Sequence, residues 1–273
     1  KIIMKLKTGF AKVNNTRLYY EIAGTGNTLV LIHGSSLDTR MWDDQFEAFT
    51  KHFQVLRYDM RGHGQSDIPT NKTYTHAADL YALLEYLKIF NVHVAGLSSG
   101  GHTAIDFALL YPNKISSLIP ISAIPTGWRN QSENKNSMTE IDEAIKTAFH
   151  TSGKRAATKL AYSHPVFSTA ILNPLSSVRM KQYLDEANWW RMLRKDPGKF
   201  EEPSQVNRLT EILVPTLVIV GDLDIPEMEP ASEDIVKKIK EATKVSLSQC
   251  GHMVNMENPK KFNKILLDFV KSI

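Results

Sequence analysis

A serine between two glycines, placed between a predicted strand and a predicted helix, constrains the fold of this chain most. Residues 96–100 read Gly-Leu-Ser-Ser-Gly, the apolar run 91–95 precedes them, and a helix-like stretch, 101–111, follows. This pattern predicts a sharp strand-to-helix turn that exposes the serine hydroxyl at its tip. The glycines lack side chains where Cβ atoms would otherwise clash. A plain surface turn is the alternative, but the partners described next favour Ser98 as a nucleophile.

A serine nucleophile needs a nearby base, and the base needs a carboxylate that orients it. A β-branched apolar run, 214–220, reads as a strand buried on both faces. Two carboxylates follow it, Asp222 directly after a glycine and Asp224 further into the loop. Asp222 is placed to cap the turn, whereas Asp224 can reach a neighbouring loop. We therefore predict that Asp224 orients the base and that Asp222 supports the turn.

His252 is the candidate base. Of the nine histidines, it alone lies in the loop after a predicted late strand, 244–248, and next to a glycine. Histidine is the usual general base near neutral pH. The order Ser98, Asp224, His252 along the chain is the order found in hydrolases that carry this strand-to-helix turn.

The donors for a developing oxyanion come from the main chain in this prediction. The apolar strand 28–32 leads into His33, Gly34 and Ser35. A backbone N–H at the start of that loop and the N–H of the residue after the nucleophile can together hold an oxyanion. We assign these donors to Ser35 and Ser99, and we expect His33 to brace the loop without taking part in catalysis.

Predicted strands and helices alternate along the chain, which favours an α/β fold with a mostly parallel sheet and helices on both faces. Strands are expected near 10–14, 17–23, 28–33, 53–58, 92–96, 115–121, 214–220 and 244–248. Helices are expected near 41–51, 75–90, 99–111, 230–240 and 257–271. The first two strands, joined by Asn14 and Asn15, read as an antiparallel hairpin at one edge.

The alternation stops between residues 125 and 205, where amphipathic stretches such as 139–149 and 177–193 predict an inserted helical cap. The predicted core is therefore 1–124 together with 206–273, and the predicted cap is 125–205. The polar run 129–136 is expected to form a solvated hinge or a mobile entrance to the cap. Candidate residues for the lining of a substrate pocket are Trp128, Phe167, Trp189, Trp190 and Met192, and an apolar lining with few charges would suit a neutral acyl or lactone group.

Four motifs together resemble the α/β-hydrolase superfamily over nearly the whole chain, from about Gly9 onward. They are His33-Gly34, the loop 59–66 (Asp-Met-Arg-Gly-His-Gly-Gln-Ser), the turn 96–100 and Gly251-His252. Segments 37–42 and 255–259 resemble small bacterial carboxylesterases, 3-oxoadipate enol-lactonases and cofactor-free haloperoxidases. Two positions depart from these relatives. Ser35 stands where a large apolar residue is common, and Ser99 where methionine or glutamine is common. The resemblance therefore does not identify the exact substrate.

The resemblance implies an eight-stranded sheet and a serine hydrolase that cleaves a carboxylic ester or a lactone through an acyl-enzyme, with no cofactor. Perhydrolysis, in which peroxide replaces water, would use the same three residues. A small-molecule sensor that acts through a protein partner is an alternative of another class. In the loop 59–66, Asp59, Arg61 and His63 are expected to satisfy buried backbone groups instead of reacting.

Composition sets limits on partners. The net charge is +4 and basic residues are dispersed, so no nucleic-acid interface is expected. The apolar runs are too short for a membrane span, and no histidine has the spacing of a metal ligand. A single cysteine, Cys250, excludes an intrachain disulfide. Residues 1–5 lack the apolar region of a signal peptide, so a cytoplasmic location is expected. A homodimer is possible, and the expected partner is a small-molecule ester or lactone.

Overall fold

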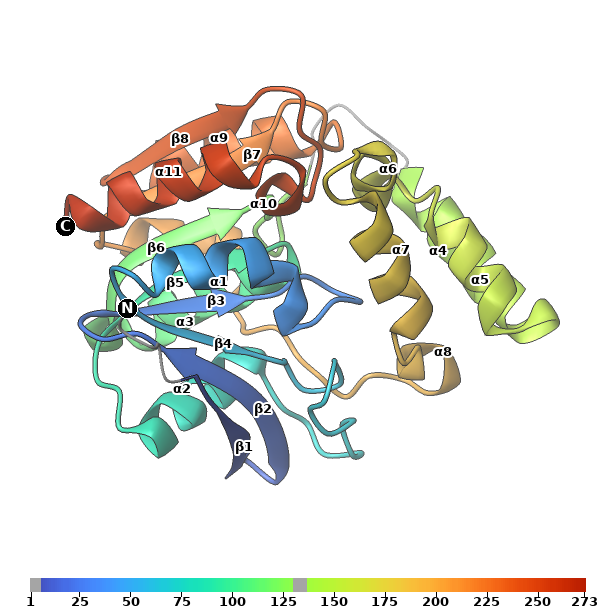
Figure 1. Cartoon of the computed structure of the whole chain (residues 1–273), viewed down its shortest axis with the longest axis horizontal. Coiled ribbons are helices and arrows are strands. Elements are labelled where there is room, and N and C mark those ends of the chain that lie inside the picture. Colours follow the sequence, from blue (N-terminus) through green and yellow to red (C-terminus); the bar gives the residue numbers. More distant parts are fainter. Residues whose placement is uncertain (1–5, 130–136) are drawn as a thin grey trace.

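A central sheet of eight strands organises the chain in the computed structural model, which describes residues 6–129 and 137–273. The strand order is β1-β2-β4-β3-β5-β6-β7-β8. The strands are β1 (Lys7–Val13), β2 (Thr16–Ala23), β3 (Thr28–Ile32), β4 (Gln54–Tyr58), β5 (Val92–Leu97), β6 (Ile115–Ile121), β7 (Thr216–Gly221) and β8 (Ala242–Leu247). All pairs are parallel except β1 with β2 and β2 with β4 (Figure 1). The predicted eight-stranded, mostly parallel sheet is confirmed.

The antiparallel edge forms as the sequence predicts. Asn14 and Asn15 connect β1 to β2, and both have positive φ values, 45° and 58°. Two successive left-handed residues match the right-handed twist of the flanking strands, and asparagine tolerates this conformation better than most residues. The hairpin therefore adds two strands at one edge without disturbing the parallel strands that carry the candidate site.

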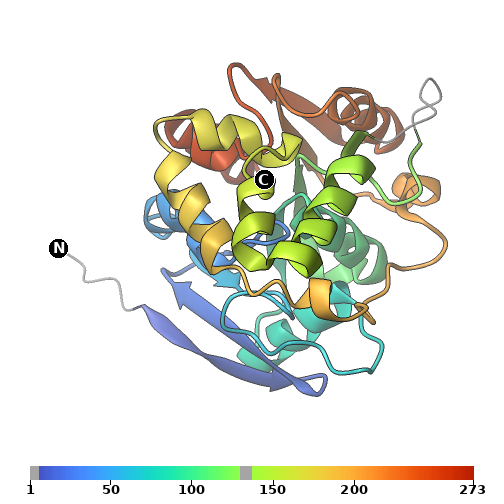
Figure 2. The same cartoon turned by 90° about the vertical axis from the view of Figure 1, so that its right-hand side faces the viewer.

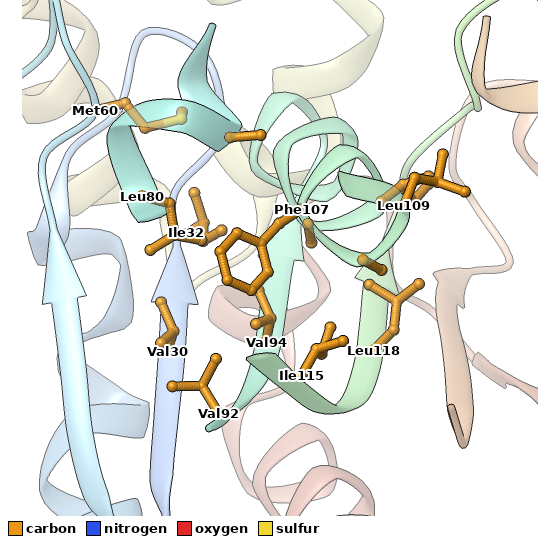
Figure 3. Close-up of a cluster of buried hydrophobic side chains, with 14 of the residues drawn as sticks. Val30, Ile32, Met60, Leu80, Val92, Val94, Phe107, Leu109, Ile115 and Leu118 are labelled. Carbon is orange, nitrogen blue, oxygen red and sulfur yellow. The ribbon is translucent and has the colours of Figure 1, made fainter. Parts of the chain in front are cut away.

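Helices cover both faces of the sheet, because the inner strands are buried at successive positions, and successive side chains point to opposite faces. Val30 and Ile32 of β3 belong to one buried cluster with α2 (His76–Leu87), α3 (Ser99–Leu110) and α9 (Met228–Lys238). Figure 3 shows part of this cluster, with Phe107 of α3 between strand side chains. Leu29 and Leu31 belong to a second cluster with α1 (Asp43–Phe49), α10 (Val254–Glu257) and α11 (Pro259–Lys271).

Within the described residues, five α-helices are inserted between β6 and β7, and we call them the cap helices. They are α4 (Ser137–Ser152), α5 (Lys154–Ala161), α6 (Pro165–Leu172), α7 (Ser177–Glu186) and α8 (Trp190–Leu193). Figure 1 places them beyond the carboxyl ends of the parallel strands, and Figure 2 views the molecule from that side. The inserted helical cap is thus confirmed as part of the fold. Its boundaries at 125 and 205 stay a prediction, and residues 130–136 of the expected hinge lie outside the described residues.

Two details of the cap differ from the sequence prediction. The stretch 177–193 was expected to be one amphipathic segment, but α7 ends at Glu186 and α8 begins at Trp190. Trp189 between them has a left-handed φ of 54°, which no helix continues through. The prediction also did not identify α5 and α6. Short 3₁₀ turns occur at 39–42, 112–114, 205–207 and 209–211.

Candidate active site

Ser98 occupies a strained turn between β5 and α3. Its φ is 55° and its ψ is −114°, and its N–H donates to the Ile121 carbonyl at 2.8 Å. A Cβ at Gly96 would lie 2.1 Å from the Gly100 oxygen, and one at Gly100 would lie 2.3 Å from the Ile32 oxygen. Any side chain at either position would therefore collide with backbone. Such strain persists only where the surrounding structure imposes it, which is typical of functional sites.

Asp224 and His252 form a buried pair after β7 and β8. His252 Nδ1 lies 2.9 Å and 3.1 Å from the two carboxylate oxygens of Asp224, and the side chains are 4% and 1% exposed respectively. The carboxylate accepts, so Nδ1 carries the proton and Nε2 presents a lone pair. Asp222 instead lies in the turn, where its carboxylate accepts from the Cys250 N–H at 3.4 Å. The structure thus pairs Asp224, and not Asp222, with His252.

Ser98 lies at the same edge of the sheet as this pair, because β5, β7 and β8 are parallel and all three residues follow carboxyl ends. His102, one helical turn after Ser98, also lies near His252. Burial lowers the pKa of His102 to about 4, with a smaller lowering from His252. Within the described residues no hydrogen bond joins Ser98 Oγ to His252 Nε2. Such bonds are often long without substrate and tighten only when it binds.

The two predicted main-chain donors follow the carboxyl ends of neighbouring parallel strands, β3 and β5. Ser99 is the first residue of α3, where N–H groups have no acceptor within the helix. Ser35 follows Gly34 at the end of β3, and the Gly34 N–H is already occupied by Met41 Sδ at 3.3 Å. Among the residues that the structure describes, the Ser35 N–H has no hydrogen-bond partner. Both amides are therefore free to donate to a ligand.

His33 braces the loop that carries Ser35. Its Nε2 accepts from the Met60 N–H at 2.9 Å, so its Nδ1–H donates to the Gly34 carbonyl at 2.7 Å. Burial lowers the pKa of His33 to about 4, which keeps the ring neutral and preserves both bonds. The bonds match the bracing role expected from the sequence.

The polar residues of the loop 59–66 also have hydrogen-bond or ion-pair partners. Asp59 accepts from the N–H groups of Thr39 and Gln65, both at 2.8 Å. Arg61 forms a buried ion pair with Asp79, with a closest separation of 2.6 Å. These contacts satisfy charged and backbone groups inside the protein, as the sequence predicts for this loop.

A cavity of about 640 Å³ lies between the core loops and the cap helices. Among the residues proposed for a pocket, Trp189, Trp190 and Met192 line it, together with Ser35. Ser98, Asp224 and His252 are not among its lining residues, so of the residues predicted for the reaction only Ser35 lines this cavity. Trp128 and Phe167 lie elsewhere: the Trp128 indole donates to Asp234, and Phe167 is buried in the second core cluster.

The lining of this cavity is charged, unlike the apolar lining that would suit a neutral acyl or lactone group. Its lining includes Glu21, Asp38, Arg40, Asp59, Asp142, Glu186 and Arg191. The physical reason is that loops and helix ends form its walls. Loops 35–40 and 59–65 face residues 186–192 at the junction of α7 and α8, and such segments carry polar side chains.

Glu257 is a residue that the sequence reasoning missed. It is 3% exposed, and its carboxylate accepts from the N–H of Gly251 at 2.7 Å and of Met253 at 3.0 Å. These amides flank His252, so the carboxylate fixes the loop on both sides of the imidazole. A buried acid five residues after a histidine has no strong sequence signature, although its place before Asn258 and Pro259 marks a helix start.

Two searches of the described ranges, 6–129 and 137–273, gave negative results. No group of three or more His, Cys, Asp or Glu side chains there is arranged to hold a metal ion. No helix there combines the length and the apolar character needed to cross a membrane.

Comparisons with known proteins identify the family of this chain. Residues 27–259 match the family model described as alpha/beta hydrolase fold. The chain is 26% identical to 3-oxoadipate enol-lactonase 1 of Acinetobacter baylyi, over 94% of each protein. It is 27% identical to a 2-hydroxy-6-oxononadienedioate/2-hydroxy-6-oxononatrienedioate hydrolase of Burkholderia vietnamiensis, over 93% of this chain and 91% of that one. Among solved structures, an enol-lactonase from Burkholderia xenovorans matches with a TM-score of 0.80 and 25% identity, over 96% of this chain and all of that one.

Proposed function

Because the chain belongs to the α/β-hydrolase fold family, we propose that it is a serine hydrolase that cleaves a carboxylic ester or a lactone. Relatives named as hydrolases and enol-lactonases support the general class of reaction. The observation that carries the proposal is the buried Asp224–His252 pair at the sheet edge where Ser98 occupies its strained turn. In this proposal the serine, the base and the orienting acid act together at this edge of the sheet.

In the proposed reaction Ser98 Oγ attacks the substrate carbonyl carbon. His252 Nε2 takes the hydroxyl proton and returns it to the leaving alkoxide, which departs as an alcohol. Water, deprotonated in turn by His252, attacks the acyl-enzyme and releases the acid. Asp224 holds the Nδ1–H tautomer of His252 and stabilises the imidazolium that forms in each half of the reaction.

The oxyanion of each tetrahedral intermediate is held by the N–H groups of Ser35 and Ser99. Both donors are fixed before the reaction, so they cost little reorganisation when charge develops. The N-terminus of α3 adds its partial positive charge at the same place. Loss of one donor of this kind typically costs about 10²–10³ in kcat.

Trapping the acyl-enzyme tests this proposal directly. The protein is mixed with p-nitrophenyl butyrate, quenched in acid within the first turnover, and analysed as intact protein and as peptides. We expect one butyryl group, attached to Ser98. Ser98→Ala should carry none. Ser99→Ala is the matched control and should still be acylated, because only the main chain of residue 99 is used. A butyryl group on another residue, or none with turnover present, would refute the covalent mechanism.

Glu257→Gln is expected to lower kcat by roughly tenfold, because an amide presents one acceptor where the carboxylate presents two. The amide NH₂ would face a backbone N–H beside His252 and displace the loop. Loss of the negative charge near the imidazolium should also move the acid limb of the kcat/KM–pH profile to lower pH. The measurement is that profile for both proteins, at matched folded fraction.

Asp268→Asn provides the control for Glu257→Gln. Asp268 lies on the following helix, α11, and pairs with Lys264 at the surface. The same chemical change there should leave both kcat and the pH profile unchanged. If Glu257→Gln lowers stability but its profile coincides with that of the parent, Glu257 supports the fold alone and does not position His252.

A further inference from the structure

Arg191 brings a positive charge next to the proposed oxyanion site. It belongs to α8 of the cap helices and lines the cavity of about 640 Å³. Its Nη1 lies 3.3 Å from Ser35 Oγ. The N–H of Ser35 is one of the two proposed oxyanion donors. A carbonyl bound by that N–H would therefore lie close to the guanidinium of Arg191.

The Arg191 side chain is held in place along one edge. Its Nε donates to Asp196 at 2.8 Å, and Asp196 is itself fixed by the Tyr74 hydroxyl at 3.0 Å and the Gly198 N–H at 2.8 Å. The guanidinium carbon also lies 5.3 Å from the centre of the Trp190 ring. Because the guanidinium of Arg191 is held along one edge, it keeps its orientation. Binding of a ligand therefore costs little conformational entropy of the Arg191 side chain.

The other edge of the guanidinium has unused hydrogen-bonding capacity. The contacts of Nη1 to Ser35 and His63 are 3.3 Å and 3.4 Å, longer than strong hydrogen bonds, and Nη2 contacts no acceptor in the described residues. His63 Nδ1–H donates to the Arg61 carbonyl, so its Nε2 faces Arg191 as a neutral acceptor. Burial lowers the pKa of His63 well below its usual value. The open edge therefore suits an anion that accepts two parallel N–H groups.

The other charged side chains of the lining already have partners: Glu21 is paired with Arg57, and Asp142 lies 3.3 Å from His164 Nε2. Arg40 is the other cation in the lining, and two carboxylates, Asp38 and Glu186, already neutralise it. Asp59 is occupied by the N–H groups of Thr39 and Gln65. Arg191 has Asp196 as its one carboxylate partner. A bound carboxylate would therefore give Arg191 a second carboxylate partner, which Arg40 already has.

We propose that the acyl part of the substrate carries a carboxylate, separated from the reacting carbonyl by a short carbon chain, and that Arg191 binds it. The proposal rests on the proposed ester or lactone hydrolysis at Ser98. Arg191 then sets specificity for acidic substrates, since an uncharged acyl chain leaves its open edge facing the cavity unpaired.

Paired esters test the carboxylate preference. Mono-p-nitrophenyl adipate carries the acid, and p-nitrophenyl 6-methylheptanoate replaces that carboxylate by an isopropyl group of similar shape. The parent protein should hydrolyse the adipate ester with at least tenfold higher kcat/KM. Arg191→Gln should reduce kcat/KM for the adipate ester by about 10–100-fold and change that for the neutral ester by less than about threefold.

Two further variants separate charge from folding. Arg191→Lys keeps the charge but not the two parallel donors, and should retain an intermediate preference. Arg194→Gln is the matched control: Arg194 lies one turn on, contacts the same Trp190 ring and donates to the Pro69 carbonyl outside the cavity. It should leave the preference unchanged. An equal loss for both esters in Arg191→Gln would show a structural role and overturn the proposal.

Binding of glutarate separates this proposal from the proposed reaction. Calorimetric titration of glutarate into Ser98→Ala should show saturable binding that Arg191→Gln in the same background removes. If glutarate binds in this way but no ester is hydrolysed by the parent protein, the carboxylate site stands and the reaction is wrong. If esters are hydrolysed without an acid preference and glutarate does not bind, the reaction stands and the carboxylate site is refuted.

Discussion

Replacing Ser98 by alanine is expected to lower kcat/KM for p-nitrophenyl butyrate by about 10³-fold or more, because Ser98 Oγ is the proposed attacking oxygen of the acyl-enzyme. The turn around residue 98 should survive the change, since its geometry depends on Gly96 and Gly100 and on backbone contacts. The measurement is steady-state hydrolysis by the parent protein and Ser98→Ala, purified side by side, with circular dichroism and thermal unfolding to verify the fold.

Combining substitutions makes this test sharper. If Ser98 and His252 act as one unit, the double variant Ser98→Ala, His252→Ala should be no slower than Ser98→Ala alone. If the two residues contributed independently, the fold losses of the two single variants would multiply in the double variant. Ser99→Ala, next to the nucleophile, should lose less than about tenfold, since only its main chain takes part. A Ser98→Ala protein that keeps more than about a tenth of the activity would show that another residue attacks the substrate.

The parts of the site that the sequence predicts are those set by local backbone constraints. The turn at 96–100 requires glycine because a Cβ at Gly96 would lie 2.1 Å from the Gly100 oxygen, and such a requirement is visible in the sequence. The choice of Asp224 over Asp222 followed from loop position, and the structure pairs Asp224 with His252. Parallel strands then bring residues at their carboxyl ends to one edge, so chain order alone implied the cluster.

The parts that the sequence did not predict depend on contacts between distant segments. The cavity is charged because loops 35–40 and 59–65 meet residues 186–192, and no local pattern encodes that meeting. The break between α7 and α8 occurs at Trp189, whose indole donates to the Leu184 carbonyl while its ring stacks on Phe149 of α4. Tertiary packing here overrides a continuous helical pattern. Glu257 was missed for the same reason, because its partners become apparent only once the His252 loop is folded.

Removing the buried guanidinium of Arg61 is expected to destabilise the fold by about 3–5 kcal/mol without removing the catalytic groups. Arg61 and Asp79 are 4% and 2% exposed, and two hydrogen bonds of 2.6 Å and 2.8 Å join them. Arg61→Met leaves the Asp79 carboxylate buried without its cation. Burial already raises the pKa of Asp79 with Arg61 present, so the lone carboxyl would be still harder to ionise. Urea unfolding at pH 7 measures the loss.

The matched control is an exposed ion pair that involves β2, the second strand of the antiparallel hairpin. Arg17 and Asp67 are joined at 3.0 Å but are 51% and 37% exposed, so Arg17→Met should cost about 0–1 kcal/mol. In the double variant Arg61→Met, Asp79→Leu no buried charge is left unpaired, so most of the lost stability should return. Under conditions where Arg61→Met is folded, its kcat should stay within about threefold of the parent. A large drop in kcat with little loss of stability would instead assign Arg61 to the chemistry, against the structural role that its contacts with Asp79 and Asn14 indicate.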